Sequence, residues 1–166
     1  MKTVVIGLGN PILTDDSVGI KVSRAIREHL GRHGEADGKN ETVDIKEVYA
    51  GGIRLMDAMT GYDHACIVDA MMTGRFRPGE VNEFDLEELC STRNIMCTHD
   101  TNLSTALELG RMLNMHLPST IKIWGIEACD VTSFGEQLTD EVERAVPEAV
   151  NAILGELNIC CQKEQP

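Results

Sequence analysis

Basic residues are scarce in this chain of 166 residues. Its 15 Lys and Arg side chains stand against 27 Asp and Glu, which gives a formal net charge of -12 at pH 7. A surface with this excess of negative charge repels a phosphate backbone. We therefore expect no nucleic acid among the partners of the protein.

Long hydrophobic runs and paired cysteines are missing too. No run of about 18 apolar residues predicts a membrane span, and the N-terminal segment reaches a glycine-rich turn too early for a signal peptide. The six cysteines form no C-x-x-C pair and no zinc-ribbon spacing, so we interpret them as ordinary thiols. We expect a cytoplasmic protein that does not insert into a membrane.

The common signatures of hydrolases are also absent. The sequence contains no H-E-x-x-H, no G-x-S-x-G and no cysteine beside an obvious histidine partner, so the familiar zincin and nucleophilic hydrolase classes are not indicated. Hydrophobic residues make up 42% and charged residues 25% of the chain, as in ordinary globular proteins. The length predicts a single domain over residues 1–166, with the last few residues as a polar tail.

Strand and helix patterns alternate along the sequence. Apolar runs and period-2 alternation predict strands, the one at 81–86 lying at a sheet edge, whereas apolar positions at helical spacing predict helices. Such alternation favours a three-layer α/β domain with a mostly parallel sheet, which binds ligands beyond the carboxyl ends of its strands. The predicted strands are 3–6, 42–49, 65–68, 81–86 and 120–126, and the predicted helices are 18–30, 53–59, 103–113 and 142–157.

The loop after the first predicted strand, residues 7–16, carries the first candidate site. A dinucleotide-binding loop would need a third glycine where Ile12 stands. Asp15 and Asp16 at the start of the following helix would also repel a pyrophosphate and favour a cation. Capping of the helix by these acids is the alternative interpretation.

Two further polar residues are candidates. Asp69 ends an apolar run, and a buried carboxylate is costly unless it is paired or bound to a cation. His99 lies in the polar stretch 90–100, which we interpret as a loop. Taken singly, Asp69 can cap the following segment and His99 can be solvated. Together with Asp16 they would supply two carboxylates and an imidazole to a divalent transition metal, with coordination positions left open.

Several short motifs occur in order through most of the chain. They are GLGNPILTDDSVG near the N-terminus, AGG at 50–52, IVDAMMTG from Ile67, THD around His99, IWG at 123–125, and a final helix that contains AVP at 145–147. This ordered set resembles the [NiFe]-hydrogenase maturation endopeptidases.

The resemblance implies both a fold and a site. The fold would be a twisted, five-stranded sheet with helices on both faces. Asp16, Asp69 and His99 would be the metal-binding and catalytic residues. Ser17 departs from the glycine that often follows the acidic pair, which should leave the metal ligands unaffected. The residues implied in substrate binding are Gly9, Asn10, Asp15, Gly51 and Gly52.

The resemblance also implies an activity. Members of the family remove a short C-terminal extension from the hydrogenase large-subunit precursor after nickel insertion. The endopeptidase would keep no permanent cofactor, because the nickel of the substrate is what it recognises, and zinc or cadmium can substitute in vitro. The metal could polarise the scissile carbonyl or activate water, or one carboxylate could act as a general base. The sequence does not choose between these routes.

Two alternatives come from other classes of protein. Peptidyl-tRNA hydrolases begin with a similar GLGNP segment, but Ile12 replaces their glycine, their Arg-His-Asn is absent, and the net charge of -12 opposes tRNA. A non-proteolytic metal-binding or chaperone relative would carry the same metal ligands. A cleavage assay is needed to separate that alternative from a peptidase.

Overall fold

The computed structural model describes residues 1–33, 42–85 and 103–157, and these residues alternate between strands and helices. Each element predicted from the sequence is present, with bounds that differ by a few residues. In chain order the elements are β1 (Lys2–Leu8), η1 (Asp15–Ser17), α1 (Val18–His33), β2 (Thr42–Val48), α2 (Ile53–Met59), β3 (His64–Met71), β4 (Val81–Asp85), α4 (Leu103–Met112), β5 (Thr120–Glu127) and α5 (Asp140–Glu156).

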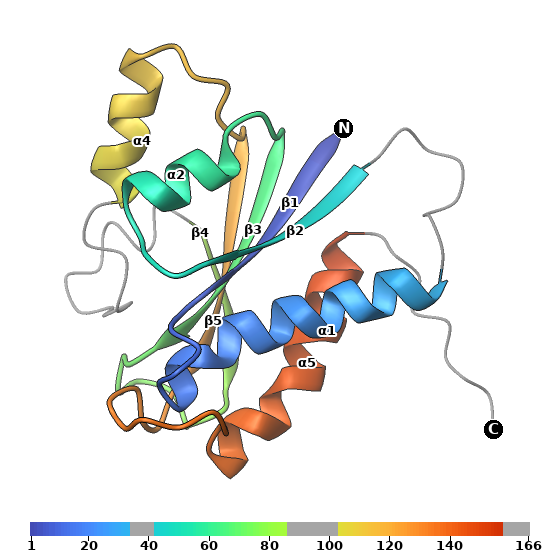
Figure 1. Cartoon of the computed structure of the whole chain (residues 1–166), viewed down its shortest axis with the longest axis vertical. Helices are drawn as coiled ribbons and strands as arrows, with labels where there is room; N and C mark the ends of the chain where they lie inside the picture. The colour runs from blue at the N-terminus through green and yellow to red at the C-terminus, as the bar shows by residue number, and fades with distance from the viewer. Residues whose placement is uncertain (34–41, 86–102, 158–166) are drawn as a thin grey trace.

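The strands form one five-stranded sheet in the order β2-β1-β3-β5-β4. The pairs β1–β2, β1–β3 and β3–β5 are parallel, whereas β4 is antiparallel to β5 and occupies an edge of the sheet. Figure 1 shows the strands crossing the centre of the molecule with a pronounced twist. The predicted fold class and the predicted edge strand are both confirmed.

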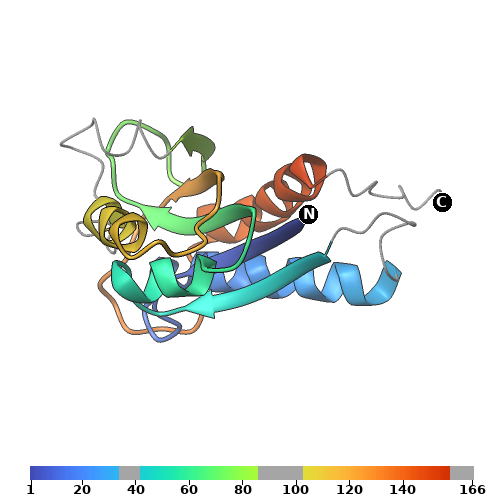
Figure 2. The ribbon, with the colours of Figure 1, turned by 90° about the horizontal axis from the view of Figure 1, so that it is seen from above.

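Helices cover both faces of the sheet because successive strand residues point to opposite sides. Val4 and Ile6 of β1 face the core shared with α2 and α4. Val5, between them, faces the core shared with α1 and α5. Figures 1 and 2 show the two helix pairs on opposite sides of the strands. Both faces are thus buried, which explains the continuous apolar runs in β1 and β3.

The strand order reverses between β1 and β3. From β1 the chain passes through α1 to β2 on one side, and from β2 it passes through α2 on the other face and returns to β3. In open α/β sheets such a topological switch point leaves a crevice beyond the carboxyl ends of the two central strands. The loop after β1 and the end of β3 therefore border the expected ligand-binding edge.

One detail of the prediction was wrong. Asp69 does not end its strand but lies inside β3, which continues to Met71. The extension follows from pairing with β5, because Asp69 pairs with Gly125 and Met71 pairs with Glu127. A polar residue can remain in a strand when hydrogen bonds to a neighbouring strand satisfy its backbone N–H and C=O groups.

None of the helices within the described ranges is long and apolar enough to cross a membrane. The longest of them, α5, has 17 residues and carries Asp140, Glu141 and Glu143 in its first turn. Negative side chains in the first turn stabilise a helix because they interact favourably with the positive end of its dipole.

Candidate active site

Asp16 lies in η1, the short 3-10 turn between the β1 loop and α1. Its side chain is almost completely buried, with a residue exposure of 2%. The backbone N–H of Asn10 donates a hydrogen bond of 2.9 Å to Asp16 Oδ2. The side chain of Asn10 in turn accepts a bond of 3.2 Å from the Ile12 N–H, so it shapes its own loop. The loop therefore fixes the Asp16 carboxylate at the carboxyl end of β1.

Gly9 allows this loop to lie against η1. A Cβ atom at Gly9 would overlap the backbone oxygen of Asp16, and the φ of Gly9 is +148°. The Gly9 N–H donates to the Val48 carbonyl at 3.2 Å, which ties the loop to the end of β2. The structure thus gives Gly9 a role in close backbone packing, and its predicted role in substrate binding stays a prediction.

Gly19 brings the start of α1 against the two central strands. A Cβ atom there would overlap the carbonyl oxygens of Leu8 on β1 and Val68 on β3. Asp16 lies three residues before Gly19, and Asp69 directly follows Val68. The absence of a side chain at Gly19 therefore lets Asp16 and Asp69 share the same edge of the sheet, on both sides of the switch point.

Asp69 is a buried carboxylate on the α2 and α4 side of the sheet. Its exposure is 1%, and its Oδ1 accepts a hydrogen bond of 2.9 Å from the Ala70 N–H. By strand alternation Asp69 shares a face with Ile67 and Met71, which belong to the core beneath α2 and α4. A carboxylate in such surroundings favours a cationic or hydrogen-bonding neighbour.

Asp15 differs from Asp16 in its contacts. Its carboxylate is fully buried and accepts hydrogen bonds of 2.9 Å from the backbone N–H groups of both Cys129 and Asp130. The backbone N–H of Thr139 donates another at 2.8 Å, and the Thr139 hydroxyl lies 2.9 to 3.0 Å from both carboxylate oxygens. Asp15 thereby fastens the segment between β5 and α5, and its predicted contact with substrate stays a prediction.

Ser17 fits the site without disturbing it. Its hydroxyl is buried and donates a 2.7 Å hydrogen bond to the Thr14 carbonyl. The bond satisfies the buried hydroxyl within η1, as an interior polar group requires. A serine at this position is therefore compatible with the local backbone.

Glu127 is a fourth buried acid near this edge, and the sequence patterns assigned it no role. It ends β5 with an exposure of 4%. Its carboxylate accepts bonds of 2.9 and 2.7 Å from the backbone N–H groups of Thr73 and Gly74, and a bond of 2.7 Å from the Thr73 hydroxyl. Glu127 thus holds the loop that follows β3. Its place directly after an apolar run, like that of Asp69, is the signal that could have identified it.

Gly51 and Gly52 border a hollow of about 410 Å³ between the loop after β2 and helix α4. We call it the α2–α4 hollow, and it is lined by residues 50–54 together with Thr105, Ala106 and Leu109. Gly52 has a φ of 64° and directly precedes α2. The predicted glycines therefore lie at a surface depression on the side of the sheet that Asp69 faces.

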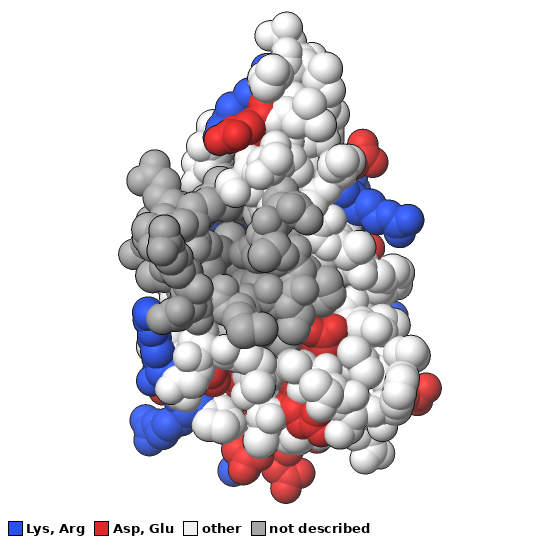
Figure 3. Space-filling view, turned by 90° about the vertical axis from the view of Figure 1, so that its left-hand side faces the viewer, with Lys and Arg blue, Asp and Glu red and all other residues white. Residues whose placement is uncertain are grey.

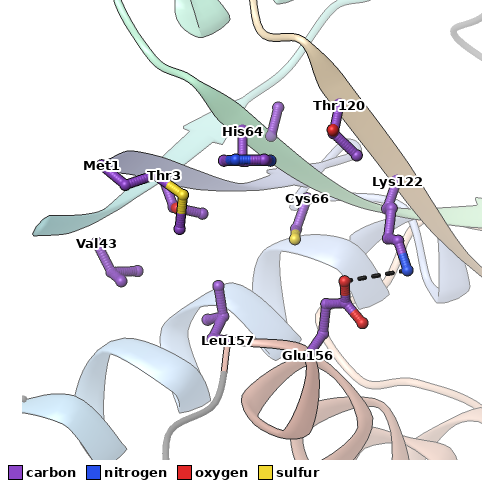
Figure 4. A pocket seen from close by; sticks show the side chains of 10 residues that line it. Met1, Thr3, Val43, His64, Cys66, Thr120, Lys122, Glu156 and Leu157 are labelled. Atoms are coloured by element: carbon purple, nitrogen blue, oxygen red, sulfur yellow. Dashed lines mark ion pairs between the residues drawn. The ribbon is translucent and has the colours of Figure 1, made fainter. Parts of the chain in front are cut away.

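A second hollow, of about 240 Å³, lies at the opposite, amino end of the strands. Figure 4 shows Cys66 and His64 of β3 on its wall, together with Lys122 and Glu156, which form an ion pair of 3.0 Å. Burial raises the pKa of the Cys66 thiol to about 11. Because only the thiolate is a strong nucleophile and metal ligand, Cys66 is unsuited to either role at neutral pH.

The third predicted ligand, His99, lies outside the described residues. Within the described ranges no group of three or more His, Cys, Asp or Glu side chains could hold a metal ion. The structure brings Asp16 and Asp69 to one edge of the sheet, and the complete three-ligand site stays a prediction. Two carboxylates at the switch point are suited to binding a cation or to acid–base chemistry on a bound substrate.

The strand order defines a doubly wound α/β protein, and Asp16 and Asp69 lie at the switch point where such proteins bind ligands. A family model described as "Hydrogenase maturation protease" matches residues 25–156. The chain belongs to the hydrogenase maturation protease family, and it is accordingly a peptidase that processes a hydrogenase precursor. This membership favours the peptidase over the peptidyl-tRNA hydrolase alternative.

Individual proteins are similar to this chain in sequence or in fold. The hydrogenase 2 maturation protease of Escherichia coli is 26% identical over 160 residues, covering 95% of this chain and 91% of the relative. The solved hydrogenase maturating endopeptidase HybD from E. coli superposes with a TM-score of 0.77 at 24% identity, over 95% and 93% of the two chains. The solved [NiFe] hydrogenase maturation protease HybD from Thermococcus kodakarensis superposes with a TM-score of 0.70 at 26% sequence identity. The superposition covers 95% of this chain and 99% of that chain.

Proposed function

We propose that the protein is a cytoplasmic endopeptidase that removes the C-terminal extension of a [NiFe]-hydrogenase large-subunit precursor after nickel insertion. It recognises the nickel of the precursor through Asp16, Asp69 and His99. The observation that carries the proposal is the pair of buried carboxylates, Asp16 and Asp69, beside the switch point of the sheet. Family membership supports the class of reaction and the class of substrate.

The chemistry of the donors fits nickel carried by the substrate. Carboxylate oxygens and an imidazole nitrogen bind divalent transition metals, and three protein ligands leave positions for groups of the precursor. Nickel held in this way would fix the nearby scissile bond against the acids, so positioning would supply much of the catalysis. The enzyme itself would need no permanent cofactor.

Substitution of Asp16 by Asn tests the role of this carboxylate. The amide oxygen of Asn can still accept the hydrogen bond from the Asn10 N–H, so the fold should persist. The lost charge should weaken attraction of the cation and reduce cleavage by about 100-fold or more. Release of the C-terminal peptide from nickel-loaded precursor, followed by mass spectrometry, gives the rate, and thermal unfolding monitors the fold.

Glu148→Gln is the matched control, because Glu148 is exposed on α5 and loses the same charge in the substitution. The Glu148→Gln variant should cleave the nickel-loaded precursor at the wild-type rate. Full activity of Asp16→Asn would remove this carboxylate from the mechanism. No cleavage by the wild-type protein would instead favour a non-proteolytic relative.

A further inference from the structure

The α2–α4 hollow exposes large aliphatic side chains at its rim. Ile53 is 61% exposed and Leu109 is 41% exposed, although both are large hydrophobic residues. Figure 3 views the side of the molecule on which α2 and α4 lie, and side chains in its upper part are mostly uncharged. An apolar depression bordered by exposed aliphatic groups is suited to burying an apolar side chain of a partner.

Arg54 is the charged residue of this lining. Its side chain is exposed, and within residues 1–33, 42–85 and 103–157 it takes part in no ion pair or side-chain hydrogen bond. Arg24 and Arg27, in contrast, both pair with Glu47. An arginine without an acidic partner among these described residues, in a chain with a net charge of -12, is available to an incoming carboxylate.

The chain connects the hollow to the edge that carries the acids, although the two are lined by different residues. Asp16 is bonded to the Asn10 N–H, and the adjacent Gly9 N–H is bonded to the Val48 carbonyl. The hollow begins at Ala50, two residues beyond Val48, which is at most about 7 Å of chain. Asp69 faces the same side of the sheet. A peptide bound at the acids could therefore extend along the loop after β2 into the hollow.

We propose that the α2–α4 hollow binds an aliphatic side chain of the C-terminal extension of the precursor, and that Arg54 pairs with a carboxylate of the same extension. This inference rests on the proposed function and adds a sequence preference to it. The carboxylate comes from an acidic side chain or from the end of the extension. In both cases the hollow favours an extension that carries an aliphatic side chain and a carboxylate. Its contribution is to the binding of the substrate.

The test uses nickel-loaded precursor and measures KM and kcat separately. Ile53→Ser and Arg54→Glu should each raise KM by about tenfold, with kcat changed by less than about twofold, because the hollow lies apart from the acids. Arg54→Lys should keep most of the affinity. Arg111→Glu reverses the same charge on α4 outside the hollow and should leave KM unchanged. Thermal unfolding verifies that each variant is folded.

Substrate variants identify the groups that are recognised. Replacing aliphatic residues of the extension by Ser should raise KM for the wild type but not for Ile53→Ser. If an acidic side chain of the extension pairs with Arg54, changing that acid to its amide raises KM for the wild-type enzyme. Replacing the same acid by Lys restores binding to the Arg54→Glu enzyme. If the terminal carboxylate is recognised, lengthening the extension with Gly and Ser raises KM instead.

The outcomes separate this inference from the proposed function. Wild-type cleavage with unchanged KM in both Ile53→Ser and Arg54→Glu would overturn the role of the hollow and leave the proposed function intact. Absence of wild-type cleavage would overturn the proposed function, and the inference about the hollow would fall with it.

Discussion

Asp15 and Asp16 are neighbours in the sequence and both are buried, yet their surroundings differ. The Asp16 carboxylate accepts a hydrogen bond from the Asn10 N–H of the adjoining loop. The Asp15 carboxylate accepts hydrogen bonds from the backbone N–H groups of Cys129, Asp130 and Thr139, which lie 114 to 124 residues away along the chain. The local sequence indicated a helix cap or a cation site for both acids. It could not indicate these distant partners, because only the tertiary fold brings them to η1.

Removing the Asp15 carboxylate should destabilise the protein. Asp15→Ala leaves the buried N–H donors of the segment between β5 and α5 without their acceptor, so we expect the free energy of unfolding to fall by about 3 kcal/mol. Urea denaturation gives this value, with Glu148→Ala as the exposed control. A loss smaller than about 1 kcal/mol would contradict the structural role of Asp15.

Strand β2 forms an exposed edge of the sheet and is linked to α1 by charged side chains. Glu47 of β2 accepts two hydrogen bonds from Arg24, at 3.1 and 2.8 Å, and one from Arg27 at 3.1 Å. The bonds from Arg24, followed by those from Arg27 and Tyr49, lower the pKa of Glu47 against the opposing effect of burial. A paired carboxylate whose pKa is lowered stabilises the folded state while it remains ionised.

The stabilisation by Glu47 should depend on pH in a defined direction. Because its folded-state pKa lies below the ordinary value of 4.5, the contribution is complete above that pH and is lost as the pH falls through the folded-state pKa. Glu47→Gln should therefore lower the free energy of unfolding by about 1 kcal/mol at pH 7. The difference from wild type should shrink progressively below about pH 4.5.

Denaturant unfolding of both proteins between pH 7 and pH 3 measures this dependence. Asp57→Asn, an exposed carboxylate change on α2, controls for the general effect of removing a negative charge. A difference between Glu47→Gln and wild type that stays constant down to pH 3 would refute the linkage.

The elements were more predictable than the positions of functional groups within them. Apolar residues at Val4, Ile6 and Ile67 predicted buried strands because a parallel sheet covered on both faces needs apolar side chains on both sides. The end of β3 was misplaced because Asp69 interrupts the apolar run while its backbone still pairs with Gly125. Strand pairing is a long-range property, so a local pattern does not determine where a strand ends.

The strand order of the sheet decides where in the molecule chemistry can occur. The switch between β1 and β3 was not readable from the sequence, which indicated only that parallel strands bind ligands at their carboxyl ends. The structure adds that Asp16 and Asp69 border this switch, and that the α2–α4 hollow opens on the side that Asp69 faces. The family assignment identifies the class of substrate, a hydrogenase precursor.

In the function proposed above, nickel in the precursor is the feature that the enzyme recognises through Asp16, Asp69 and His99. The most direct measurement incubates the wild-type protein with matched apo and nickel-loaded large-subunit precursor and follows release of the C-terminal peptide by mass spectrometry. Nickel would supply both affinity and register for the scissile bond. We expect cleavage of the nickel-loaded precursor alone. Equal cleavage of the apo precursor would contradict recognition through nickel.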